Sequence, residues 1–334
     1  MEISLSSSPS PLEIFRSVPS TRLLTGPTPI EPCDRLKAIL PSGPNLFIKR
    51  DDFTTYLVGG NKVRKLEYTM AQVLRLGATA VITVGSFQSN HARITAMVAR
   101  RLGLKCYLVL NGNGEVRPSG NYLISKMLGV DIVPVRSRDE RVPMMDEIGR
   151  DLQARGERVY KIPLGASDEV GSLGLTAGLA EVLDQEKAMG LKFDAILFGS
   201  SSGGTQAGLE VGKRLFGRED LRLIGISPDD PAPAIRAVIA DVARKMLSEL
   251  RLPNGLRPED IQVDDSHFGD GYGIPTEASE EATRLFAHRE GILLDPVYTS
   301  KVGAALIDYC RNGLFGRTDN VLFWHTGGLI GLFN

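Results

Sequence analysis

Two glycine-rich segments of this chain hold residue types that bind anions and bond covalently to carbonyl compounds. The first, residues 199–208 (GSSSGGTQAG), follows a short apolar run and precedes a helical pattern. Consecutive small residues let backbone N–H groups converge on an anion, a helix start adds about half a positive charge, and hydroxyl groups add donors. The segment lacks the lysine of a GxxxxGK[ST] loop and fits GxGxxG poorly. We expect a phosphate-binding cup, the alternative being a tight turn between strand and helix.

The second segment, residues 59–67, reads GGNKVRKLE. Lys62 follows a Gly-Gly loop at a predicted helix start, where it could be held near the edge of a sheet and desolvated. A desolvated lysine has a lowered pKa, which suits bond formation with a carbonyl group. From spacing alone, however, a solvated basic turn of Lys62, Arg64 and Lys65 is favoured, because most lysines are exposed.

Three further segments combine polar side chains with turns. Residues 85–93 (GSFQSNHAR) lie between an apolar run and a helical pattern, and Ser89 or Asn90 is a candidate N-cap. The exposed N–H groups of such a helix start can also bind a carboxylate. A plain cap needs only one polar residue, and the four consecutive polar residues here favour a binding role. Residues 295–299 (DPVYT) and 325–328 (HTGG) are, on their own, typical of a packing tyrosine and a turn.

These segments alternate with regular elements that must position them. Nearly continuous apolar runs predict strands covered on both faces, as in a parallel sheet, at residues 78–85, 105–111, 131–135, 159–163, 195–199, 221–227 and 320–324. Helical patterns include residues 89–102, 121–128, 172–188 and 205–216. The alternation predicts an α/β fold with right-handed crossovers, in which ligands bind beyond the carboxyl ends of strands. The Ser- and Pro-rich first 30 residues predict an arm over the body rather than a core element.

The composition excludes several function classes. The chain has 334 residues, of which 42% are hydrophobic and 24% charged, and its 39 basic and 40 acidic residues give a net charge of −1. We therefore expect no nucleic-acid partner, and the lack of a run of about 20 apolar residues predicts no membrane partner. Cys33, Cys106 and Cys310 are far apart and the four histidines are scattered, so we expect ordinary core or surface cysteines, no disulfide framework and no metal site. The N-terminal residues do not resemble a secretory signal, which predicts a cytoplasmic protein.

In this order along the chain, GGNKVRKLE, QSNHAR, GGTQAG, DPVYT and HTGG resemble the pyridoxal-phosphate enzymes of the tryptophan-synthase-β-like fold (fold type II). The resemblance covers about residues 28–328 and is greatest to the branch of D-cysteine desulfhydrase and 1-aminocyclopropane-1-carboxylate (ACC) deaminase. It implies that Lys62 holds pyridoxal 5'-phosphate covalently, that Asn90 contacts its ring hydroxyl, and that Thr299 and Thr326 lie near its pyridine nitrogen. The phosphate would be bound by Ser201, Ser202, Gly203, Gly204 and Thr205.

The resemblance also implies how the substrate is held. Ser89 and His91, with the helix start behind them, would bind the carboxylate of an amino acid, and Lys62 would remove its α-proton once released from the cofactor. The catalytic residues would be Lys62, Ser89 and Tyr298, and the substrate-binding residues Ser89, Asn90, His91, Tyr272 and Tyr298.

The family implies two lobes with parallel sheets wrapped by helices and the cofactor in the cleft between them. We expect a large lobe of residues 1–64 and 175–334 and a small inserted lobe of residues 65–174. The family commonly forms homodimers, which we expect here as well.

Two positions favour one branch activity. The resembled deaminases have glutamate after the tyrosine (DPVYE) and leucine in the last turn (HLGG), where this chain has Thr299 and Thr326. A carboxylate keeps the pyridine nitrogen protonated and the ring a strong electron sink, whereas a hydroxyl accepts an unprotonated nitrogen. Opening a cyclopropane needs the strong sink, and α,β-elimination of a good leaving group does not. His91, where the deaminases have glutamine, points the same way. We therefore predict a lyase that converts D-cysteine to pyruvate, ammonia and sulfide, with ACC deaminase and L-cysteate sulfo-lyase as alternatives.

Some residues bear on the identity of the substrate, and two other function classes are alternatives to a pyridoxal-phosphate enzyme. Tyr56 and Ile94 depart from the branch pattern, and we expect them near the pocket mouth, where Phe87 would also narrow the pocket. A non-catalytic protein that binds a phosphate ligand would use the loop at Gly199 but have no need of Lys62. A nicotinamide-dependent oxidoreductase would need GxGxxG followed by an acidic residue, a pattern that the loop lacks.

Overall fold

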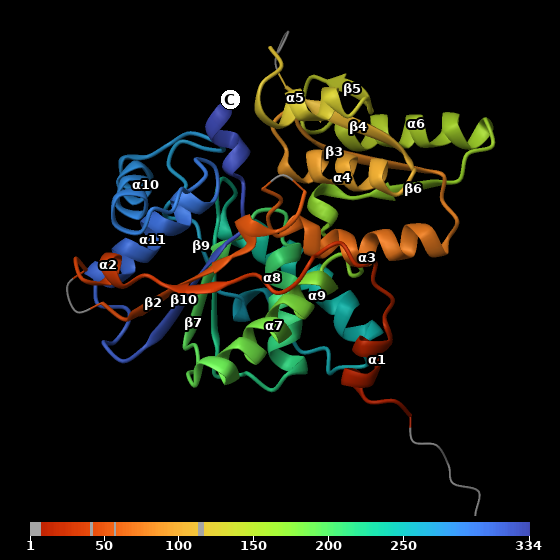
Figure 1. The fold of residues 1–334 in the computed structure, drawn as a ribbon. Helices are drawn as coiled ribbons and strands as arrows, with labels where there is room; N and C mark the ends of the chain where they lie inside the picture. Colours follow the sequence, from red (N-terminus) through yellow and green to blue (C-terminus); the bar gives the residue numbers. More distant parts are fainter. Residues whose placement is uncertain (1–7, 41–42, 57, 113–116) are drawn as a thin grey trace, which may run out of the picture.

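In the computed structural model, which describes residues 8–40, 43–56, 58–112 and 117–334, the strands form two sheets (Figure 1). The larger sheet has the order β1-β2-β10-β7-β8-β9 and the smaller has β5-β4-β3-β6. Neighbouring strands pair in parallel, except that β1 and β2 are antiparallel. The strands are β1 (Ile30–Pro32), β2 (Asn45–Arg50), β3 (Ala80–Ser86), β4 (Lys105–Asn111), β5 (Asp131–Val135), β6 (Val159–Ile162), β7 (Ala195–Gly199), β8 (Arg222–Ile226), β9 (Val263–Asp264) and β10 (Asn320–His325).

Helices cover both faces of each sheet. They are α1 (Pro11–Ser17), α2 (Asp34–Lys37), α3 (Lys62–Arg75), α4 (Asn90–Arg101), α5 (Gly120–Met127), α6 (Arg141–Ala154), α7 (Leu173–Met189), α8 (Gly204–Leu215), α9 (Ala232–Glu249), α10 (Glu277–Glu290) and α11 (Thr299–Arg311). Along β7, Ala195 and Leu197 pack in a cluster with α10 and α11, whereas Ile196 and Phe198 pack with α7 and α8. Because such a strand is buried on both sides, its sequence is a continuous apolar run rather than an alternating one.

The seven strands and four helices predicted by residue range are all present, with ends that differ by at most two residues. The α/β prediction is therefore confirmed. Three strands were not predicted: β1 and β9 have only three and two residues, and β2 (NLFIKR) ends in two buried charges. Lys49 pairs with Glu181 of α7, and Arg50 pairs with Asp52, so β2 is central in the sheet despite a polar half.

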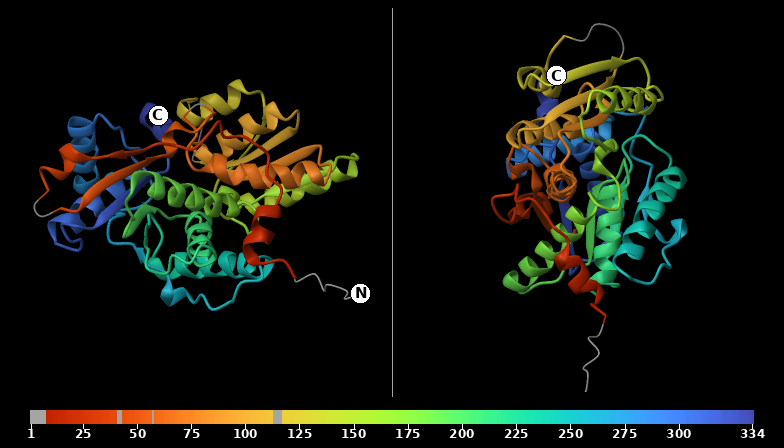
Figure 2. Two further views of the ribbon diagram at one scale, coloured as in Figure 1. Left: turned by 60° about the horizontal axis from the view of Figure 1, so that its bottom comes forward. Right: turned by 90° about the vertical axis from the view of Figure 1, so that its right-hand side faces the viewer.

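The N-terminal arm is anchored more firmly than its sequence suggests. Residues 8–30 run along the outside of the body, as predicted, but they include α1 (Figure 2). Ser10 and Glu13 form a capping box, and Pro11 occupies the first helical turn. Phe15 is buried against Tyr68 and Phe216, which corrects the expectation that the arm contributes nothing to the core. Residues 1–7, which begin the segment that does not resemble a secretory signal, lie outside the described residues.

The strands of the small sheet all lie within residues 65–174, and those of the large sheet lie outside this range. Where α3 meets α7, a Cβ on Gly174 would lie 2.1 Å from the carbonyl oxygen of Arg64, so this glycine allows the two helix starts to pack closely. None of the helices in the described ranges combines the length and apolar character needed to cross a bilayer.

Candidate active site

A cavity of about 1190 Å³, its open mouth included, lies between the two sheets. Its wall includes residues at or just beyond the carboxyl ends of β3, β4, β5, β6, β7, β8 and β10, as expected for parallel sheets. Most of the predicted site residues are on this wall: Lys62, Ser89, Asn90, His91, Ser201, Ser202, Gly203, Thr205, Tyr272, Tyr298 and Thr326. Gly204 and Thr299 are not.

Lys62 is held by two interlocked turns. It is the first residue of α3, and the preceding Asn61 donates its backbone N–H to the carbonyl oxygen of Thr326 at 3.1 Å. Gly60 has a φ of +83°, and a Cβ there would lie only 2.3 Å from the same oxygen, so only glycine fits. Burial lowers the pKa of Lys62 to about 8. The solvated basic turn is therefore excluded for Lys62, whose amine faces the cavity and is partly neutral near pH 7.

The glycine-serine loop after β7 has the features of an anion site. The N-cap of α8 is Gly203, which has a φ of +79° and no side chain to bond the first helical amides. The wall hydroxyls of Ser202 and Thr205 are oriented by Ser167 Oγ at 2.8 Å and by Asn61 Nδ2 at 3.0 Å. Uncapped amides at a helix start, together with hydroxyl donors, fit the three oxygens of a phosphate group.

Gly204 supports this loop from behind. A Cβ at this position would lie 2.7 Å from three atoms of Ser167, so the glycine allows the loop to pack against residue 167. The position that a side chain would take on Gly204 faces Ser167 rather than the cavity, which explains why Gly204 is not on the cavity wall.

The start of α4 supplies donors on another wall. Ser89 is the N-cap, and its Oγ accepts the N–H of Ala92 at 3.2 Å. Asn90 Oδ1 accepts from Asn121 Nδ2 at 3.0 Å, which leaves the Asn90 amide group as a donor at the wall. Capping by Ser89 is thus compatible with a donor from Asn90 that points to the cavity wall.

His91 is in a different state from the one expected. Thr83 Oγ1 donates to the carbonyl oxygen of Ile162 at 2.9 Å, so it accepts from His91 Nε2–H at 2.8 Å. Burial, with the nearby charges of Lys62 and Lys65, holds the pKa of His91 well below its usual value. Its Nδ1 is buried with no partner among the described residues. A neutral ring with a free acceptor cannot donate to a carboxylate, so the expectation that His91 holds the substrate carboxylate does not fit this ring.

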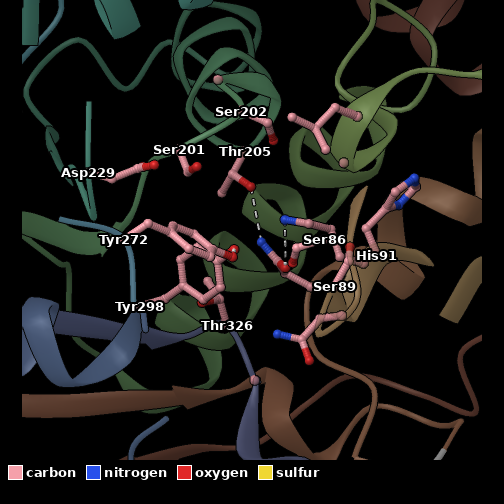
Figure 3. A pocket seen from close by; sticks show the side chains of 18 of the residues that line it. Ser86, Ser89, His91, Ser201, Ser202, Thr205, Asp229, Tyr272, Tyr298 and Thr326 are labelled. Atoms are coloured by element: carbon pink, nitrogen blue, oxygen red, sulfur yellow. Dashed lines mark hydrogen bonds between the residues drawn. The ribbon is translucent and has the colours of Figure 1, made fainter. Parts of the chain in front are cut away.

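Two tyrosines form the wall near α11, and a buried aspartate behind the wall lies in the turn that carries one of them (Figure 3). Tyr272 and Tyr298 share a hydrogen bond between their hydroxyl groups, and their rings cross at 75°. Asp295 accepts the N–H groups of Val297 and Tyr298 at 3.0 Å and so fixes the turn that carries Tyr298. Burial raises the pKa of both tyrosines, so they stay protonated donors.

Thr299 does not reach the cavity. It is fully buried, and its hydroxyl donates to Asp295 Oδ1 at 2.8 Å and accepts the N–H of Asp295 at 2.7 Å. We therefore correct the expectation that both threonines face the cofactor, because of the two only Thr326 is on the wall.

The three residues expected at the pocket mouth lie elsewhere. Ile94 is fully buried in the core under α4, and Phe87 packs on Tyr122 with ring centres 4.7 Å apart. Tyr56 packs beside the same core, with the Arg101 guanidinium over its ring. This expectation was wrong, and Leu57 of the same segment lies outside the described residues. Cys33, Cys106 and Cys310 are free and buried.

Sequence reasoning missed several polar wall residues. They are Asn61, Ser86, Asn111, Arg138, Arg141, Asp229 and Asp230. Ser86 and Asn111 end β3 and β4, and Arg138 and Asp229 follow β5 and β8 within three residues. The rule that ligands bind beyond strand ends could have found them if it had been applied to every predicted strand. In the described ranges, no three His, Cys, Asp or Glu side chains gather as a metal site.

Comparisons with known proteins agree with this geometry. Residues 21–327 match a family model described as "Pyridoxal-phosphate dependent enzyme". The chain is 37% identical over 320 residues to the D-cysteine desulfhydrase of Yersinia pestis (strain Pestoides F), covering 94% of this chain and 95% of that protein. It is 36% identical over 329 residues to the D-cysteine desulfhydrase of Salmonella typhi, with 97% and 98% covered. A crystal structure titled as an ACC deaminase homologue has a TM-score of 0.89 and 34% identity, with 98% and 97% covered.

Proposed function

Because the chain belongs to the pyridoxal-phosphate-dependent enzymes, we propose that it is a lyase that catalyses α,β-elimination of a small amino acid. D-Cysteine is the substrate that we favour, with pyruvate, ammonia and sulfide as products. In this reaction the Cα–H and Cβ–S bonds break, sulfur leaves with the bonding electrons, and the remaining enamine is hydrolysed by water. When bound, the cofactor supplies an electron sink for the bond broken at Cα.

The residues of the cavity fit pyridoxal 5'-phosphate. Lys62 offers an amine that is partly neutral near pH 7, which is the form that bonds to an aldehyde. The uncapped start of α8, with Ser201, Ser202 and Thr205, would hold the phosphate. Asn90, with its free amide N–H groups, would donate to the ring hydroxyl. Thr326, as a neutral side chain, would lie near the ring nitrogen.

The chain's own residues then have distinct tasks. The amides at the start of α4, with Ser89 as N-cap, would bind the substrate carboxylate and orient its Cα–H bond. Lys62, released on substrate binding, would accept the α-proton. Tyr298 and Tyr272 are protonated and share one hydroxyl hydrogen between them, so the remaining O–H of the pair would donate to the developing charge on the leaving sulfur.

Thr326 is the observation that favours elimination over ring opening. It lies on the wall, and the second threonine, Thr299, is already bonded to Asp295. No carboxylate is therefore supplied at residues 299 and 326 to keep the ring nitrogen protonated. The relatives named D-cysteine desulfhydrase support the same choice. ACC deaminase is the second candidate, because the structure with a TM-score of 0.89 is titled as a homologue of that enzyme.

Three finer points complete the proposal. The lobes divide at residues 64/65 and 174/175, which is supported by the separation of the two sheets. The enzyme acts in the cytoplasm, in keeping with its three reduced, buried cysteines. It forms a homodimer, as the family resemblance implies.

A pyruvate and 2-oxobutyrate assay tests the function. Cofactor-loaded protein is offered D-cysteine, L-cysteine, L-cysteate, D-serine and ACC side by side. Pyruvate from D-cysteine without 2-oxobutyrate from ACC supports the proposal. Formation of 2-oxobutyrate from ACC would show that a threonine-lined nitrogen suffices for ring opening, and would refute the argument from Thr326.

A further inference from the structure

Arg141 is a guanidinium without a carboxylate partner on the cavity wall. It is the first residue of α6 and half-buried, and its Nε donates to the carbonyl oxygen of Arg138 at 3.0 Å. None of the described carboxylates forms an ion pair with it. Burial and the nearby charge of Arg138 lower the pKa of Arg141. The first turn of α6 has no acidic residue, so the helix start adds positive potential. Burying the unpaired charge of Arg141 costs free energy, which an anionic group of a ligand would offset.

Two carboxylates after β8 also have unused acceptor atoms. Asp229 Oδ2 pairs with Arg138 at 2.9 Å. The Asp229 side chain is only 7% exposed, and its Oδ1 is buried without a hydrogen-bond partner in the described chain. The carboxylate of Asp230 likewise has no partner among the described residues and is on the wall. Their loop is fixed, because Lys301 Nζ donates to the carbonyl oxygen of Pro228 at 2.9 Å. Both residues line the cavity, and the loop that carries them is held in place.

These unpaired charges lie away from the start of α4. Arg138 lies over the ring of Tyr272 at 5.4 Å and so places Arg141 and the aspartates beside the tyrosine pair. In Figure 3, Asp229 and Tyr272 lie on the opposite side of the pocket from Ser89 and His91. The same cavity is lined both by residues of the proposed cofactor side, such as Lys62, and by Arg141, Asp229 and Asp230.

We propose that Arg141, Asp229 and Asp230 form a second amino-acid subsite, which binds the zwitterionic end of a substrate whose two amino-acid halves are joined through sulfur. A guanidinium binds a carboxylate through paired N–H donors, and carboxylates accept the N–H groups of an ammonium. A ligand with only an anion would satisfy Arg141 alone, and one with only a cation would satisfy the aspartates alone. A zwitterion satisfies both.

The inference rests on the proposed elimination and specifies its substrate class. For a thioether of two alanine halves (lanthionine), the Cα–H and Cβ–S bonds of one half break and sulfur keeps the bonding electrons. The sulfur takes a proton and leaves as cysteine, and water converts the remaining enamine to pyruvate and ammonia. The distal half, bound by the second subsite, is the leaving group.

The test compares meso-lanthionine, which presents one D and one L half, with D- and L-S-ethylcysteine, which lack the distal zwitterion. Initial rates of pyruvate formation give kcat/KM for each. We expect the wild-type enzyme to favour meso-lanthionine by about tenfold or more, the difference of one well-placed ion pair. Arg141→Gln should lower this preference about tenfold, mainly through KM, and Asp230→Asn should lower it less. Arg141→Lys should restore part of it.

The control is Arg150→Gln, which removes an exposed arginine of the same helix and should leave the preference unchanged. A wild-type enzyme that favours S-ethylcysteine overturns the second subsite. So does a preference that survives Arg141→Gln in an enzyme that still converts D-cysteine. If no sulfur amino acid yields pyruvate, the elimination itself is refuted and the subsite with it.

Discussion

The two sides of the cavity are built in different ways. The side that would hold the cofactor consists of backbone turns packed on each other, with Gly60 against Thr326 and Gly203 at the start of α8. The side that would hold the substrate's distal end consists of long side chains such as Arg138 and Tyr272, which meet across the two sheets. We infer that the first side tolerates almost no change of shape, whereas the second can be altered to change substrate choice.

The two sides also differ in how their charged side chains are buried and paired. On the cofactor side, burial lowers the pKa values of Lys62 and Lys65, and neither forms an ion pair with a carboxylate of the described residues. On the other side, Arg138 has Asp229 as a partner, and its side chain is 51% exposed. An exposed pair of this kind contributes little free energy. Substitutions on the two sides should therefore differ greatly in effect.

The largest effect is expected for Lys62→Ala. Loss of the amine removes both the covalent bond to the cofactor and the proposed proton acceptor, so pyruvate formation should fall by at least about 10³-fold. The visible absorbance band of the lysine-bound cofactor should also be lost. Lys187→Ala, at a side chain that is 78% exposed, is the matched control and should be unaffected. Near-normal activity of Lys62→Ala would refute the assignment of Lys62 as the residue that binds the cofactor covalently.

Gly60→Ala should be the next most severe change. The added Cβ would lie 2.3 Å from a backbone oxygen of Thr326, at a φ of +83°. We expect unfolding free energy to fall by at least about 2 kcal/mol and cofactor affinity to fall with it. Gly103→Ala provides the control, because its φ is +72° but nothing lies within 4 Å of the added carbon. Urea unfolding of both variants separates the effect of the clash from that of backbone strain. Equal losses of unfolding free energy in the two variants would contradict the close packing of the two turns.

The contrast between the two sides also explains what the sequence could predict. Strands and turns were found because burial on two faces and positive φ values leave continuous apolar runs and glycines. Arg138 and Asp229 were missed because single charges in polar loops resemble solvated surface until the sheets bring them together. Thr299 was misplaced because a local bond to Asp295 takes its hydroxyl. Ile94 was misplaced because its position on α4 faces the core.

The pH dependence of cofactor uptake tests the cofactor side more finely. With a pKa of about 8, the neutral amine of Lys62 increases about tenfold between pH 6 and 7 and saturates above about pH 9. The rate at which apoprotein gains the visible band with pyridoxal 5'-phosphate should follow this curve. Lys65 and His91, which lie near Lys62, have their own pKa values lowered by burial. A rate that still rises tenfold per unit above pH 9 would mean an ordinary, solvated lysine.

The smallest effect, and the one that most sharpens the comparison, is expected for Arg138→Gln. It removes a half-exposed ion pair to Asp229 and a cation–π contact at 5.4 Å to Tyr272, each worth about 1 kcal/mol or less. Unfolding free energy should therefore change by less than about 1 kcal/mol. KM for D-cysteine should rise about threefold, because Tyr272 loses the group that lies over its ring, and kcat should change little. Since salt screens an exposed pair, the wild-type KM should approach that of Arg138→Gln as ionic strength rises. If Arg138→Gln instead destabilised the fold as strongly as Gly60→Ala, the substrate side would be as rigid as the cofactor side, and specificity could not be altered there independently.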